Sequence, residues 1–325
     1  MDSQAHAVVH AVVAEVSKVV LGQAELVEKL LVALLADGHV LLEGVPGLAK
    51  TQLVSALGRA TGGVFRRVQL LPDMMPSDVT GSLIYHPDER QFRVQKGPLL
   101  DTHFLLADEL NRTPPKVQAA FLQAMQEREV TIGTATYPLL DPFIVLATQN
   151  PVEEEGTYPL PEAQLDRFLF KLLVPYPDEE TELRLLDTPA LEQRQPATEV
   201  QAVTTPAELV ALREQLKTAV YVSEPVKQYI VRLVRATRQP ERCPGLQDLR
   251  GLVRLGASPR ATLNLRKASR VWAFLQGRRF VLPEDVKALA PDVLRHRIVL
   301  DFRAESSGVT VEEVVQRLLE KVEIP

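Results

Sequence analysis

The chain has 325 residues, of which 46% are hydrophobic and 24% charged, and its formal net charge is −5. This length exceeds the usual size of one hydrophobic core, and the composition excludes an intrinsically disordered chain. The acidic balance offers no general basic field for a nucleic-acid backbone, so a compact ligand or a protein partner is favoured.

The cysteine and histidine content argues against a disulfide framework and a zinc site. The single cysteine, Cys243, cannot form a disulfide within the chain, and the six histidines lack paired ligand spacing. The apolar stretch 8–20 is interrupted by charged residues, which predicts an amphipathic helix rather than a leader or a membrane span. We therefore expect a cytoplasmic protein without a transmembrane segment.

Short apolar runs alternate with helical patterns through the first half of the chain. Because buried strands alternating with helices are typical of parallel sheets, we expect an α/β fold with helices on both faces of a five-stranded sheet. Two further stretches, 81–94 and 130–137, are predicted to be β-hairpins inserted into this plan. Strands are expected at 40–42, 64–70, 104–107, 143–147 and 168–174, with helices at 26–35, 52–60, 114–127 and 162–167.

The pattern changes at Pro175–Pro177, beyond which helix follows helix. The sequence therefore predicts an α/β domain over 1–176 and a smaller all-α lid domain over 177–325. A stretch rich in Gln, Pro and Thr, 193–205, is the expected exposed linker. Helices of the second domain are expected at 225–237, 259–276 and 283–290.

A serine and a proline mark the start of one helix in the second domain. Ser258 is a typical N-cap residue, and Pro259 suits the first helical position. Arg260 is therefore expected in the first turn of that helix.

A glycine-rich loop follows the first predicted strand and opens the next predicted helix. Its glycines allow backbone N–H groups to approach phosphate oxygens, while Lys50 can reach the β- and γ-phosphates and Thr51 can ligate Mg²⁺. Ala49 stands where the general P-loop pattern has glycine. The loop predicts binding of ATP with Mg²⁺ by Gly44, Val45, Pro46, Gly47, Leu48, Ala49, Lys50, Thr51 and Gln52.

Polar residues stand at the ends of two later strands. Asp108 and Glu109 follow one buried strand and Asn150 follows the next. ATP hydrolysis needs a carboxylate on the metal and a group that activates water. We expect Asp108 to bind Mg²⁺, Glu109 to act as the catalytic base, and Asn150 to contact the γ-phosphate or the attacking water.

Three segments together resemble the MoxR family of AAA+ ATPases, a branch with an insert in its second helix. They are EGVPGLAKT (43–51), ADELNRTPPK (107–116) and LPEAQLDRF (160–168), and the resemblance extends over about residues 15–300. Alanine at position 49 is the form that this family has.

The resemblance implies further site residues. Asn150 matches the sensor-1 position, and Arg167 matches the arginine finger that reaches a neighbouring subunit's nucleotide. Arg260 matches sensor 2, and Gly22 and Gln23 belong to a segment that lies against the adenine in this superfamily.

A finger that acts on a neighbour implies a homo-oligomeric ring, most simply a hexamer. The resemblance also implies chaperone-like remodelling of protein complexes, with partners that carry von Willebrand factor A domains. Three alternatives remain open: a motor subunit related to magnesium chelatase, a nucleotide-switched binding module with negligible hydrolysis, and a nucleic-acid motor, which the acidic charge disfavours.

Overall fold

The computed structural model of the chain describes residues 2–44, 50–150, 156–186 and 199–324. It divides into two compact units, which we describe separately. The first comprises Met1–Leu160 and Leu172–Leu212, and the second comprises Pro161–Lys171 and Arg213–Pro325. Among the described residues, no helix has both the length and the apolar character needed to cross a bilayer.

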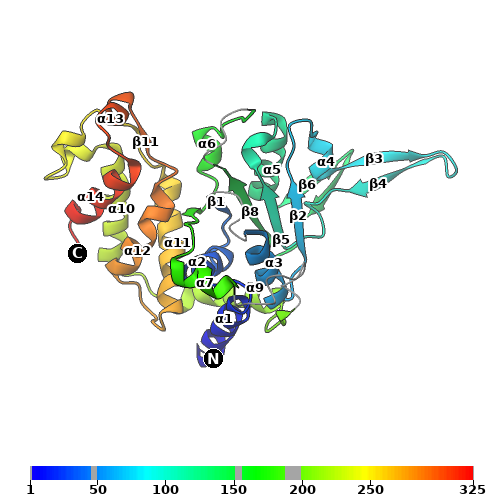
Figure 1. Cartoon of the computed structure of the whole chain (residues 1–325), viewed down its shortest axis with the longest axis horizontal. Helices are drawn as coiled ribbons and strands as arrows, with labels where there is room; N and C mark the ends of the chain where they lie inside the picture. The colour runs from blue at the N-terminus through cyan, green and yellow to red at the C-terminus, as the bar shows by residue number, and fades with distance from the viewer. Residues whose placement is uncertain (1, 45–49, 151–155, 187–198, 325) are drawn as a thin grey trace. The chain divides into compact units, whose positions relative to one another are not determined.

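A five-stranded sheet with the order β2-β5-β8-β1-β9 forms the centre of the first unit (Figure 1). Strands β5 and β8 pair in parallel with each other, with β2 and β1 as their outer parallel neighbours. The three inner strands are almost wholly buried, whereas β2 at the edge is largely exposed. The predicted α/β fold is confirmed, with strands β1 (Val40–Glu43), β2 (Phe65–Gln69), β5 (Phe104–Asp108), β8 (Ile144–Gln149) and β9 (Phe170–Leu173).

Helices accompany these strands at the predicted places. The α3 helix packs against β2 and β5 and also contacts α1, which in turn contacts α2. The helices that the first unit contributes are α1 (Asp2–Ser17), α2 (Ala24–Leu35), α3 (Lys50–Ala60), α4 (Pro76–Thr80), α5 (Pro115–Glu127) and α7 (Glu179–Leu186); α9 (Pro206–Ala219) crosses the division between units.

Both predicted hairpins are present. The β3 (Gly81–His86) and β4 (Gln91–Lys96) strands form an arm that extends from the sheet (Figure 1), and β6 (Glu129–Ile132) pairs with β7 (Ala135–Pro138). Gly133 turns the second hairpin at φ +62°, where an added Cβ would lie 2.5 Å from a methyl group of Leu83. The base of the arm therefore packs on the turn of the second hairpin.

The second unit is mainly helical, as expected for a lid. Three of its helices start with proline in the first turn, and serine or threonine side chains cap three helices. A short antiparallel ribbon, which the all-α prediction did not include, joins β10 (Val253–Leu255) to β11 (Val299–Leu300). The helices are α6 (Glu162–Leu165), α10 (Glu224–Arg238), α11 (Pro259–Leu275), α12 (Pro283–Leu294), α13 (Phe302–Ser306) and α14 (Val311–Lys321).

Residues 172–212, most of which the sequence analysis assigns to the lid, cluster with the first unit. The amide of Gln201 bonds the Glu15 carboxylate at 3.0 Å, and the amide of Val203 bonds the Ala60 carbonyl at 2.9 Å. Val200 and Thr204 are buried, whereas Glu199, Gln201, Ala202 and Thr205 are exposed, so the described part of the expected linker, 199–205, is mainly exposed and anchored at two positions. Residues 193–198 of that linker lie outside the described part of the chain.

His39, just before β1, hydrogen-bonds to the backbone of α5 and of β8. Its Nδ1 accepts from the amide of Val145 at 3.0 Å, and its Nε2 lies 3.2 Å from the carbonyl of Met125. The ring is therefore neutral with its proton on Nε2. Burial, with a smaller contribution from the charge of Arg128, lowers the pKa of His39 to about 3.

This lowered pKa predicts acid sensitivity of the first unit. Because the unfolded His39 takes up a proton below about pH 6.5 and the folded one does not, its contribution is present above that pH and is lost as pH falls towards 3. His39→Gln should reduce the loss of unfolding free energy between pH 7 and pH 5 by about 2 kcal/mol. Urea unfolding at both pH values measures this, with exposed His10→Gln as the control. An unchanged pH dependence in His39→Gln would contradict the assignment.

Candidate functional site

The ends of the predicted phosphate-binding loop meet in the first unit. Residues 45–49, with the predicted ligands Val45, Pro46, Gly47, Leu48 and Ala49, lie outside the described part of the chain. On either side of them, Gly44 follows β1 and Lys50 begins α3. The Lys50 ammonium donates a hydrogen bond to the Gly44 carbonyl, and this bond joins the two residues that flank 45–49.

Three carboxylates act on the charge of Lys50. Burial lowers the pKa of the Lys50 ammonium, and the negative charges of Asp108, Glu43 and Glu109 oppose that shift in this order. Both acids of the predicted catalytic pair therefore interact electrostatically with Lys50. Thr51, the predicted metal ligand, is half-buried in the first turn of α3.

The hydroxyl of Thr148, in β8, joins the two acids. It accepts a hydrogen bond from the Glu109 amide at 2.8 Å and lies 3.2 Å from Asp108 Oδ1, to which it donates. Glu109 has left-handed backbone angles, φ 61° and ψ 51°, which turn the chain sharply at the end of β5. Asn150 is buried directly after β8, at the same edge of the sheet.

Basic and amide side chains that the sequence analysis did not assign to the site also reach the acids; two lie on β2, outside the motifs, and one, Arg112, lies within 107–116. Arg67 Nε lies 2.5 Å from Asp108 Oδ2, and Gln69 Nε2 donates to Glu109 Oε2 at 2.9 Å. Arg112 Nε lies 3.2 Å from the same Glu109 oxygen. Arg67 and Gln69 are two positions apart on the edge strand β2 and so lie on the same face, but no polar–apolar alternation in that strand marks them in the sequence.

The segment predicted to contact adenine lies between two helices. Gly22 has φ +72°, and a Cβ there would lie 2.7 Å from the Thr181 hydroxyl. Gln23 precedes α2, and its Oε1 is buried without a hydrogen-bond partner among the described residues. Gln52, predicted as a nucleotide ligand, donates to the Val19 carbonyl at 2.6 Å and so links α3 to this segment.

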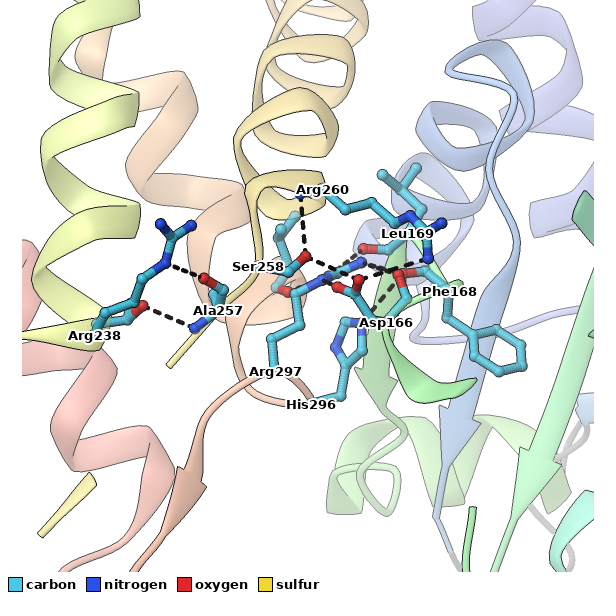
Figure 2. A network of polar contacts seen from close by, with 11 residues as sticks. Asp166, Phe168, Leu169, Arg238, Ala257, Ser258, Arg260, His296 and Arg297 are labelled. Carbon is cyan, nitrogen blue, oxygen red and sulfur yellow. Dashed lines mark hydrogen bonds and ion pairs between the residues drawn. The ribbon is translucent and has the colours of Figure 1, made fainter. Parts of the chain in front are cut away.

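The two predicted arginines belong to the second unit. Ser258 caps α11 by accepting from the Arg260 amide at 3.1 Å, so Arg260 lies in the first turn as predicted. Arg167 follows α6 and is half-buried. Figure 2 shows that Arg260 and Ser258 both face Asp166, the residue before Arg167.

Comparisons with known proteins agree with this arrangement. The model of the ATPase family associated with various cellular activities (AAA) matches residues 39–170, and that of the AAA lid domain matches 250–318. The chain is 46% identical to the chaperone MoxR1 of Mycobacterium tuberculosis, over 96% of this chain and 81% of that protein. It is 35% identical to the protein MoxR of Methylorubrum extorquens, over 96% and 93% of the two chains. The chain belongs to the MoxR family of AAA+ ATPases.

A solved structure of this type supports the fold of this MoxR-family ATPase. A candidate ATPase from Cytophaga hutchinsonii superposes with a TM-score of 0.92 at 43% sequence identity, covering 100% of this chain and 97% of that one. Because identity is high over the whole length, the P-loop fold and the helical lid are those of the family.

Thr148 supplies a test of the site. Thr148→Val keeps the shape of the side chain but leaves the Glu109 amide and one Asp108 oxygen without their partner. We expect ATP hydrolysis to fall about tenfold and the first unit to lose about 1–2 kcal/mol of stability, while nucleotide affinity changes little. Phosphate release and nucleotide titration measure these effects. Thr148→Ser, which keeps the hydroxyl, is the control, and wild-type turnover in Thr148→Val would contradict the role.

Proposed function

We propose that this protein is an ATP-hydrolysing ring oligomer that remodels protein complexes. The observation that carries the proposal is the edge of the sheet where Thr148 joins Asp108 to Glu109 and where Gly44, bonded to the Lys50 ammonium, follows β1. Family membership supports ATP hydrolysis as the reaction. The chaperone designation of the relative MoxR1 supports remodelling as its use.

The residues present fit ATP with Mg²⁺. Mg²⁺ is usually held by one or two protein oxygens together with substrate phosphates and water, so a cage of protein ligands is not needed. Within the described ranges no group of three or more His, Cys, Asp or Glu is arranged to hold a metal ion, which agrees with this sparse mode. We assign Thr51 and Asp108 to the metal and Lys50 to the phosphates. The unpartnered Gln23 oxygen is an acceptor suited to an amino group such as that of adenine.

The roles of the remaining residues follow from what each can do. Glu109 is proposed to take a proton from water, because Thr148 holds its backbone amide while Gln69 and Arg112 hold its carboxylate. Asn150 is proposed to orient that water or the γ-phosphate. Arg260 is proposed to contact the phosphates as sensor 2, and Arg167 those of the neighbouring subunit.

The ring and its partners rest on the assignment of Arg167. An active site that needs a guanidinium from a neighbour works only in an assembly, for which we propose a hexamer. A client or cofactor protein with a von Willebrand factor A domain remains the proposed partner class. The exposed aromatic pair Tyr85 and Phe92 on the β3–β4 arm, with ring centroids 5.3 Å apart, is available for contacts outside the subunit.

Glu109→Gln tests the reaction itself. The amide keeps the size of the side chain but cannot accept a proton, so ATP should still bind while turnover falls by roughly a hundredfold or more. Nucleotide titration and steady-state phosphate release separate the two effects. Glu89→Gln, on the distant β3–β4 arm, is the matched control. Hydrolysis at the wild-type rate in Glu109→Gln would remove Glu109 from this role.

Arg167→Ala tests the assembled site. Because the guanidinium is proposed to act on a neighbouring subunit, nucleotide affinity of the isolated subunit should stay near the wild-type value. Turnover of the assembled protein should fall by roughly a thousandfold, the usual effect of losing such a group. Sedimentation with nucleotide establishes that the variant still assembles. Full activity in an assembled Arg167→Ala protein would refute the finger.

A further inference from the structure

One carboxylate in the second unit, that of Asp166, lies next to both predicted arginines: it contacts Arg260, the predicted sensor 2, and directly precedes Arg167, the predicted finger. Asp166 Oδ2 accepts from the Ser258 hydroxyl at 2.8 Å and lies 3.5 Å from a terminal nitrogen of Arg260 (Figure 2). Ser258 in turn accepts from the Arg260 amide. Both ends of Arg260 are therefore linked to one oxygen of Asp166, which directly precedes Arg167.

A buried arginine fixes the other side of the same carboxylate. Arg297 Nε donates to Asp166 Oδ1 at 2.8 Å, and its side chain is only 1% exposed. Burial lowers the pKa of Arg297 to about 10, an effect that Asp166 opposes, so Arg297 keeps its charge at neutral pH. A buried charge pair of this kind is costly to break from one side.

The same guanidinium holds the backbone on both sides of Arg167. One terminal nitrogen of Arg297 donates to the Asp166 carbonyl at 3.1 Å and to the Phe168 carbonyl at 2.5 Å. The Phe168 carbonyl also lies 3.2 Å from His296 Nε2. Arg167 thus stands on a backbone clamped immediately before and after it.

The contacts of Asp166 differ in strength, which shows which of its partners is most easily displaced. The Arg297 contact is short and buried, whereas the Arg260 contact is 3.5 Å long and the Arg260 side chain is 42% exposed. Exposed ion pairs contribute little and exchange readily, so a phosphate can replace Asp166 as the partner of Arg260. The contacts to Arg297 and Ser258 would remain when that happens.

We propose that Asp166 is a positioning residue that couples Arg260 to Arg167. It holds Arg260 by a weak ion pair. When a phosphate replaces that ion pair, the Asp166 carboxylate loses one of its partners, and this loss is transmitted to the backbone of 166–168, which carries Arg167. Nucleotide sensed by one subunit would thereby set the finger offered to the next. This inference rests on the proposed roles of Arg167 and Arg260.

Asp166→Asn separates the contact of Asp166 with Arg297 from its contacts with Ser258 and Arg260. The amide oxygen can still accept from Arg297, while the amide nitrogen turned towards Ser258 and Arg260 no longer attracts the guanidinium. We expect kcat to fall about tenfold and KM to change less than about threefold, because the interaction acts on the finger rather than on nucleotide binding. Ser258→Ala breaks the same link from α11 and should act in the same direction.

The matched control is Glu162→Gln. Glu162 lies in the same segment, and its side chain forms an exposed 2.8 Å ion pair with Arg254. Its backbone carbonyl accepts from the Asp166 amide at 3.0 Å, a bond that Glu162→Gln leaves in place. It should leave kcat, KM and the thermal unfolding midpoint of the protein unchanged.

Double-mutant cycles on the assembled full-length protein decide between coupling and a merely structural role. In Arg260→Ala and in Arg167→Ala backgrounds, Asp166→Asn should cost less than about threefold in kcat, because the coupled partner is already absent. Asp166→Asn activity equal to that of Glu162→Gln, or a full tenfold loss in both backgrounds, overturns the coupling.

If Arg167→Ala and Arg260→Ala are themselves fully active, the proposed function fails and the coupling fails with it. If these two are impaired while Asp166→Asn is normal, only the coupling fails.

Discussion

The hydroxyl of Thr148 is the contact on which the geometry of the proposed hydrolytic site depends. Strands β5 and β8 run in parallel, so their carboxyl ends reach the same edge, and Thr148 joins them through the amide of Glu109 and the carboxylate of Asp108. Strand β1 pairs with β8 on its other side and brings Gly44 to that edge. The parallel order β5-β8-β1 is therefore the constraint that brings Gly44, where the predicted phosphate-binding loop begins, to the edge that carries the two acids.

In each unit, charged side chains of the proposed site interact with opposite charges in the absence of nucleotide. In the first unit the negative charges of Asp108, Glu43 and Glu109 act on Lys50, and Arg67 pairs with Asp108. In the second unit Asp166 is held between Arg297 and Arg260. A triphosphate with its metal would compete for these partners. Nucleotide binding would then exchange existing ion pairs for new ones instead of neutralising unpaired charges. We propose that this exchange links the nucleotide state to the positions of Arg260 and Arg167.

Local patterns in the sequence were enough for the sheet, the loop and the acid pair, because apolar runs and the spacing of Lys50 and Asp108 are short-range signals. They could not predict Thr148 or Asp166, whose partners lie about 40 and 130 residues away in the chain. The placement of 177–212 with the lid rested on helical pattern alone. Its membership of the first unit depends on contacts with residues such as Glu15 and Ala60, which no local pattern reveals.

The central claim is that a neighbour's Arg167 completes the site containing Glu109. Mixing Glu109→Gln and Arg167→Ala proteins before nucleotide-driven assembly measures it most directly, because each variant is predicted to be nearly inactive alone. In a random one-to-one ring roughly a quarter of the sites would combine an intact Glu109 with an intact neighbouring Arg167. The account predicts recovery of phosphate release to about that fraction of the wild-type rate. A mixture that co-assembles and stays as inactive as its components would contradict it.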